Sequence, residues 1–250
     1  MNSTIQTQLN HKSIRNFTNE PISDEIINSL KEVANRTASS VCMQQASIIR
    51  ITDKEKRKIL SSIATQPYIE TAPELWIFIV DIYRNYSICK EQGVDISKNI
   101  TYDNFIQGFT DATLMIQNVV NAIESLNLGN VILGSILNDV EKVIEILNLP
   151  KYTYPVAGLA FGKIEKSPEL KPRLDINNKF FDDNYKIYDN YLETISNYDN
   201  EMKLYYDIRN ANKPLPAFSQ QILQRFSKDK TEEAHRHTIN ILKKQGFIFY

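Results

Sequence analysis

The sequence predicts an α+β fold, with roughly four strands and many helices in one domain and a mostly helical C-terminal excursion. Short β-branched or apolar runs, such as "ASIIRIT" and "ELWIFIVDI", are typical of strands. Longer segments between them carry apolar residues at helical spacing. After about Lys171 the composition shifts toward Tyr, Asn, Asp and Lys, which separates the excursion from the domain.

The first half of the domain alternates helices and strands. Ser23 is expected to cap a helix that continues to about residue 36, and 46–52 is short and β-branched, hence a strand. Residues 53–64 follow as a charged helix capped by its first residue. Residues 74–82 are almost all apolar, which predicts a strand buried on both faces.

Residues 103–128 predict one long helix whose apolar side chains occupy most of its circumference. A helix apolar on most sides is buried, either centrally or at a subunit interface. We expect Gly129 to end it.

The remaining elements follow in order. A strand is expected at 130–135, a helix opened by a capping box at 138–147, a strand at 154–162, a long helix at 187–208 and a last helix at 231–245.

Composition excludes several functional classes. With 29 basic and 30 acidic residues, binding nucleic acid through net charge is not expected. Two cysteines without CxxC spacing and three histidines predict no metal site. The N-terminus has no apolar signal region, and no apolar run approaches the ~20 residues of a membrane helix. We therefore expect a cytoplasmic protein with reduced thiols.

The segment "NHKSIRNFTNEPIS" (10–23) concentrates cationic and hydroxyl side chains. If it is extended, His11, Ser13 and Arg15 share one face and Lys12 lies on the other. His11 and Arg15 would then be ~13 Å apart, a span that suits a long ligand with a phosphate at one end. The alternative is a solvated edge strand whose charges prevent aggregation.

Three further polar stretches are candidate ligand contacts. In "ELKPRL" (169–174), Lys171 and Arg173 form a short basic fork suited to a phosphate. "TASSVCMQQAS" (37–47) could line a pocket, and Gln66 offers an amide that donates and accepts. Each could equally be an ordinary loop. Because no nucleophile, zinc, Walker or dinucleotide motif is present, an enzymatic function would depend on a bound cofactor.

Together these residues resemble the nitroreductase superfamily, and most closely its NADPH-dependent nitro/flavin reductase subgroup. "HKSIRNFTNEPIS" resembles the family opening. The similarity continues in order through "QPYIETAPELWIFIVDIYR", "AIESLNLGNVILGSILNDVEKV", "LNLPKYTYPVAGLAFG" and "LKPRL", over most of residues 4–175.

The resemblance implies FMN bound non-covalently at the interface of an intertwined homodimer. It also implies a mixed, mainly antiparallel sheet flanked by helices, with 103–128 as the dimer-core helix. Residues 1–175 would form the FMN-binding core, and 176–250 a helical excursion that packs on the core and on the partner subunit.

The resemblance also implies site residues. His11 and Ser13 would lie near the FMN phosphate with Lys171 and Arg173, and Arg15 would reach the pyrimidine edge of the flavin. The full set of expected cofactor contacts is His11, Lys12, Ser13, Arg15, Ser39, Gln66, Ile132, Leu133, Gly134, Ser135, Lys171 and Arg173. Arg209, Lys213 and Arg236 are the candidates for the NADPH phosphate. No metal and no catalytic side chain are expected, since solvent can supply protons.

The function implied is two-electron, ping-pong hydride transfer from NAD(P)H through FMN to nitroaromatics, quinones or free flavins. Three departures leave alternatives open: Leu137 stands where relatives have Arg, Pro214 stands where a further Arg is common, and "EEAHRHT" leaves only His235 and Arg236 as candidates for a basic group seen there in relatives. The choice between NADPH and NADH stays open. A low-turnover FMN carrier or redox sensor is the second hypothesis, and an interaction module the third.

Overall fold

The computed structural model describes residues 1–206, 214–227 and 231–250, except the side chains of 231–236. Contacts divide the chain into two compact units. The first unit holds Met1–Ser167 and His235–Tyr250, and the second holds Pro168–Ala234. The sequence predicted a division between residues 175 and 176, whereas the contacts place it after Ser167 and group the chain's last residues with the first unit.

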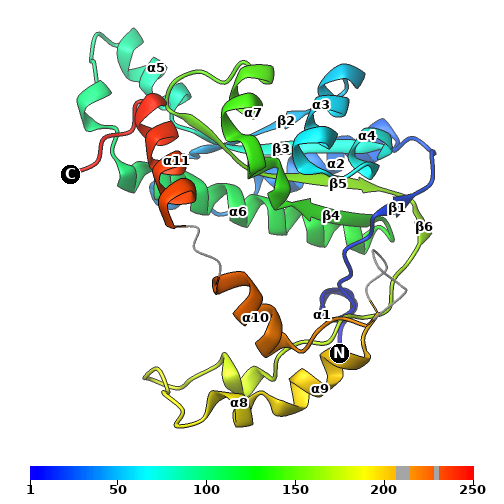
Figure 1. Ribbon diagram of the computed structural model, residues 1–250. Helices are drawn as coiled ribbons and strands as arrows, with labels where there is room; N and C mark the ends of the chain where they lie inside the picture. The colour runs from blue at the N-terminus through cyan, green and yellow to red at the C-terminus, as the bar shows by residue number, and fades with distance from the viewer. Residues whose placement is uncertain (207–213, 228–230) are drawn as a thin grey trace. The chain divides into compact units, whose positions relative to one another are not determined.

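The first unit is built on a four-stranded antiparallel sheet with the strand order β2-β3-β5-β4 (Figure 1). Its strands are β2 (Ala46–Arg50), β3 (Glu74–Asp81), β4 (Gly129–Leu133) and β5 (Thr153–Gly162). A second, two-stranded sheet pairs β1 (Asn16–Phe17) with β6 (Ile164–Lys166). The predicted α+β fold is confirmed.

Helices cover both faces of the larger sheet (Figure 1). The α-helices of the first unit are α1 (Ser3–Leu9), α2 (Asp24–Asn35), α3 (Lys54–Ala64), α4 (Tyr68–Thr71), α5 (Tyr83–Glu91), α6 (Tyr102–Ser125), α7 (Val140–Ile146) and most of α11 (Thr231–Lys244). Three 3₁₀ turns join them: η1 (Ser40–Cys42), η2 (Ser97–Asn99) and η3 (Gly134–Asp139).

Strand β3 separates two apolar layers, because successive side chains of a strand point to opposite faces. Trp76, Phe78 and Val80 pack toward α2, α6 and α11. Leu75 and Ile77 pack on the other face, toward α3, α4 and α7. All five side chains are buried, which confirms the predicted double-sided burial.

The second unit contains η4 (Ile176–Asn178), α8 (Tyr191–Thr194), α9 (Ser196–Leu204) and α10 (Phe218–Phe226). The single helix predicted at 187–208 is wrong: α8 and α9 are separate, with Ile195 outside helical geometry between them. The segment is rich in Asn, Asp and Tyr, which have modest helix propensity and offer competing side-chain caps, as Asn190 does here.

Two predicted helix boundaries are also corrected. Gly129 does not end α6. The helix ends at Ser125, Asn127 takes the left-handed conformation, and Gly129 begins β4. The capping residue of α7 is Asp139, whose carboxylate accepts the Lys142 N–H. None of the helices in the described ranges is long and apolar enough to cross a membrane.

Candidate functional site

The cationic segment at 11–15 lies along β4, the edge strand of the main sheet. Ser13 forms an isolated parallel bridge with Asn130, and the Ile14 N–H donates to the Asn130 carbonyl at 2.8 Å. Ile14 is 3% exposed and anchors the segment in the core. The cationic residues therefore lie beside the strand that contains Ile132 and Leu133 and that is followed by Gly134 and Ser135.

A glycine makes this close approach possible. A Cβ at Gly129 would lie 2.7 Å from two side-chain atoms of Ile14 and 2.8 Å from a third. Gly134, at the other end of β4, differs, because a Cβ there would meet nothing within 4 Å. Gly129 is thus required by packing, whereas Gly134 borders open space, as a close approach of a ligand to the backbone requires.

Lys12 and Arg15 have different surroundings in this segment. Lys12 and Ile14 line a cavity of about 500 Å³ together with Glu124 and residues of α1. Arg15 is half-buried, and its Nη1 donates weakly to the Ser13 carbonyl at 3.4 Å. Ser13 and Arg15 do not line this cavity, whereas His11 pairs with Glu124, which does line it, so the expected separation of Lys12 from His11 stays a prediction.

His11 is paired, which the sequence analysis missed. Its Nδ1 lies 2.6 Å from Glu124 Oε1 on α6, and Asn130 Nδ2 donates to the same oxygen at 3.1 Å. Asn130 is fully buried, and its Oδ1 is the buried side-chain atom left without a partner in the described part of the chain. Such an orphan typically costs ~1–3 kcal/mol unless a water meets it. The feature of the sequence that could have indicated this partner is Glu124, the one Glu in the largely apolar helix predicted at 103–128.

Gln66 follows the C-terminal end of α3, and η3 lies next to that end of the helix. Asn138 Nδ2 donates to the Ile63 carbonyl at 3.1 Å, which ties η3 to the last turn of α3, three residues before Gln66. Leu137 packs against both apolar layers of the sheet. The apolar residue at this position is therefore explained by packing.

Ser39 lies in the loop before β2, beside a different part of α6. Its loop is held by Asp111, which is 2% exposed and whose carboxylate accepts the backbone N–H groups of Ser40 at 2.7 Å and Gln45 at 3.2 Å. Asp111 and Glu124 are 13 residues apart on one helix, so the two contacts are about 20 Å apart along its axis. One protomer does not bring Ser39 to His11.

The Ser39 loop is also strained. Val41, Cys42 and Gln44 have φ values of 45°, 60° and 51°, in the left-handed region that β-branched residues rarely adopt. Asn85 donates to the Met43 carbonyl at 3.1 Å, and Arg84 donates to the Gln44 carbonyl, so the conformation is held from several sides. Strain of this kind often accompanies a functional loop.

The basic fork belongs to the second unit, where Lys171 is half-buried and Arg173 exposed. Arg173 Nη1 donates to the carbonyls of Lys171 at 3.0 Å and Pro172 at 3.3 Å. Arg209, Lys213 and the side chain of Arg236 lie outside the described residues, so those three NADPH contacts stay predictions.

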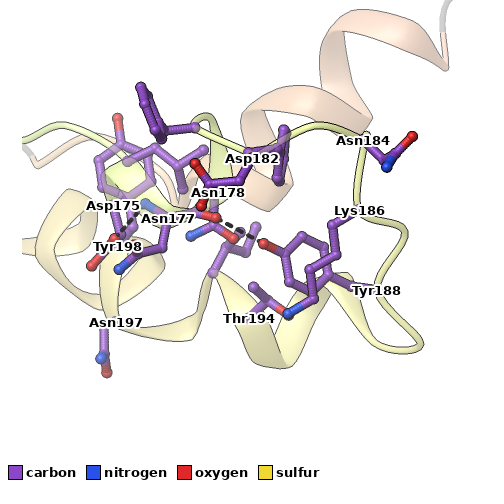
Figure 2. Close-up of a pocket in the computed structure, with 14 residues that line it drawn as sticks. Asp175, Asn177, Asn178, Asp182, Asn184, Lys186, Tyr188, Thr194, Asn197 and Tyr198 are labelled. Atoms are coloured by element: carbon purple, nitrogen blue, oxygen red, sulfur yellow. Dashed lines mark hydrogen bonds between the residues drawn. The ribbon is translucent and has the colours of Figure 1, made fainter.

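A larger pocket, of about 670 Å³, lies within the second unit (Figure 2). Amide and aromatic side chains line it, and Tyr188 Oη donates to the Asn177 carbonyl at 2.8 Å across it. None of its lining residues is a predicted cofactor contact. Within the described ranges, no group of three His, Cys, Asp or Glu side chains could hold a metal ion.

Comparison with known proteins gives consistent matches over the whole chain. The Nitroreductase family profile matches residues 9–163, and the profile of the Nitroreductase family, C-terminal domain, matches 171–250. An FMN reductase (NADPH) of Bacillus subtilis is 35% identical over 250 residues, covering 99% of both chains. An oxygen-insensitive NADPH nitroreductase of Salmonella typhimurium is 34% identical over 248 residues, again covering 99% of both. The solved NfrA1 nitroreductase of B. subtilis has a TM-score of 0.89 at 33% identity, covering 98% of this chain and 99% of that one.

Proposed function

Because the chain belongs to the nitroreductase family, we propose that it is an FMN-dependent oxidoreductase that uses NAD(P)H. Its acceptors are nitroaromatics, quinones or free flavins. The observation that carries the proposal is the cationic segment at 11–15, held along β4 with Gly134 open to a ligand. Two relatives that match nearly the whole chain are named as an FMN reductase and an NADPH nitroreductase.

The residues present fit FMN. His11, Ser13 and Arg15 offer cationic and hydroxyl donors, which a phosphate and a polar ring edge require. Gly134 leaves room beside the backbone. FMN, when bound, supplies the two-electron hydride chemistry. The chain's own residues bind and orient it, and the cation of Arg15 favours negative charge at the polar edge of the ring.

We also propose a homodimer with a composite site. In a single protomer the Ser39 loop, through the Ser40 N–H, and His11 contact α6 at positions about 20 Å apart, so Ser39 and His11 reach one flavin only if a second copy supplies one of them. Along α6, Ile106 and Leu114 are 43% and 47% exposed. The sequence predicted this helix to be buried nearly all round, and a partner subunit would complete that burial. The placement of Lys171 and Arg173 at the phosphate, and the packing of the C-terminal excursion on both subunits, belong to the same proposal.

Flavin spectroscopy tests the main proposal directly. Protein purified with its flavin should show the visible flavin bands, and anaerobic NADPH or NADH should bleach them within the turnover time. A colourless protein that does not bind added FMN would refute the proposal. Slow bleaching by both nicotinamides would favour the FMN carrier or redox sensor. The packing of Leu137 gives that alternative no support.

Two further measurements address the finer points. Relative rates of bleaching by NADPH and NADH test the donor preference, and a loss of that preference on Arg209→Ala would assign a role to that residue. Sedimentation should show the mass of two chains if the dimer exists. Cell fractionation tests the cytoplasmic location expected from the sequence.

A further inference from the structure

We propose that Glu124 is a positioning residue for the FMN phosphate, acting through His11. The inference deepens the proposed function and depends on it, because it assumes that His11 faces the phosphate. The family resemblance suggested His11 and Ser13 at that end of the cofactor. The partner of His11 is apparent only in the folded chain.

Three groups meet at one oxygen atom. Glu124 Oε1 lies 2.6 Å from His11 Nδ1 and 3.1 Å from Asn130 Nδ2. The Glu124 side chain is 11% exposed and that of His11 33% exposed, so the carboxylate is shielded while the ring still reaches the surface. Since Asn130 also accepts the Ile14 N–H, the network is fixed to β4.

This geometry decides where the proton of His11 lies. An ionised carboxylate can only accept hydrogen bonds, so Nδ1 must carry a hydrogen. Nε2 is then the ring nitrogen left for a ligand, and the orientation of the ring is set by Glu124. Carboxylate–imidazole pairs orient histidines toward bound groups in this way.

The paired carboxylate also determines which ligand the ring favours. A phosphate dianion has acceptor oxygens and no donor, so Nε2 can bond it only if it also carries a proton. His11 then becomes an imidazolium between two anions, and Glu124 compensates part of its charge. Without Glu124 the ring would lose both the contact that fixes its orientation and the nearby anion that stabilises a doubly protonated ring, which would weaken phosphate binding.

The prediction separates FMN from riboflavin, which lacks the phosphate. Protein stripped of flavin is titrated with each, following flavin fluorescence. We expect Glu124→Leu to weaken FMN binding roughly 10- to 100-fold, by analogy with the loss seen when a metal-binding histidine loses its hydrogen-bonded carboxylate. Riboflavin binding should change less than about twofold. Glu124→Gln, which keeps an acceptor and loses the charge, should give a smaller loss for FMN alone.

Matched variants establish that the effect passes through His11. His11→Ala combined with Glu124→Leu should bind FMN no more weakly than His11→Ala does, because coupled residues are not additive. Glu145→Gln is the control, since Glu145 is an exposed helical Glu paired to Lys142 at 2.9 Å. Glu145→Gln should alter neither the FMN affinity nor the riboflavin affinity.

Nitrogen NMR supplies a readout that does not depend on affinity. In flavin-free protein, His11 should carry its proton on Nδ1, and Glu124→Gln should redistribute it between the two nitrogens. FMN, and not riboflavin, should bring a second proton to Nε2. If Glu124→Leu does not fold, this measurement and Glu124→Gln decide the question.

The outcomes distinguish this inference from the proposed function. Equal losses for FMN and riboflavin, unchanged FMN affinity in Glu124→Leu, or additive effects with His11→Ala would overturn the positioning role alone. Wild-type protein that binds neither flavin would overturn both.

Discussion

Replacing Gly129 with Ala should displace the cationic segment from β4. The new Cβ would lie 2.7 and 2.8 Å from three side-chain atoms of Ile14, closer than a Cβ approaches other atoms in proteins. Ile14 is 3% exposed and cannot move without disturbing the core around it. Overpacking of this kind typically destabilises a fold by ~1–3 kcal/mol. For a chain of this length each kcal/mol lowers Tm by roughly 2–4 °C.

The assay combines stability with flavin affinity. Thermal or urea unfolding of flavin-free Gly129→Ala should show that loss of stability, and FMN titration should show weaker binding because residues 11–15 have shifted. Gly134→Ala is the matched variant. Its Cβ meets nothing within 4 Å, so stability should change by less than about 0.5 kcal/mol while FMN affinity falls.

A second substitution isolates the cause. Gly129→Ala combined with Ile14→Ala removes two of the three side-chain atoms that the new Cβ would contact and leaves the Cβ of residue 14. Part of the flavin affinity should therefore return even though the core loses volume. If Gly129→Ala keeps wild-type stability and affinity, the packing argument for this segment is wrong.

Three further predictions follow from other contacts. Arg15→Ala should weaken FMN binding or slow flavin reduction more than Lys12→Ala, since Lys12 lines a separate cavity to which Arg15 does not contribute. Equilibrium titration compares the two variants, and the reverse order would contradict the assignment. Asp111→Asn should destabilise the chain by ~1–3 kcal/mol, because an amide accepts at one oxygen and leaves one of two backbone N–H groups unmet; urea unfolding and proteolysis of the 38–45 loop measure it. The hydrogen bond from Lys244 lowers the pKa of Glu141, so this contact between α7 and α11 stabilises the fold above the ordinary carboxyl pKa, and its contribution disappears as pH falls through the lowered pKa. Glu141→Gln should therefore reduce the unfolding midpoint slightly at pH 7 and leave it unchanged at about pH 2, and an equal effect at both would refute the linkage.

Local elements followed from the sequence because their signals are local. Ser23 and Asp53 cap α2 and α3 as expected, since each carboxylate or hydroxyl accepts an N–H three residues on. The apolar run of β3 implied burial on both faces, and Gly246, with φ of 94°, follows α11, which ends close to the predicted residue 245. The boundary at Gly129 failed because glycine ends helices and also permits close packing, and only the position of Ile14 distinguishes the two.

The sequence alone determined the α+β class, the strands of the main sheet and the cofactor class, since periodicity, caps and the ordered motifs are properties of neighbouring residues. Tertiary structure alone decided which groups meet. Glu124 lies 113 positions from His11 and Asp111 lies 71 from Ser40, and neither pairing has a local signal. Hydrogen bonds act over about 3 Å in space whatever the separation along the chain. Glu124 and Asp111, which hold the candidate site residues, therefore reach their partners only when α6 packs against the sheet.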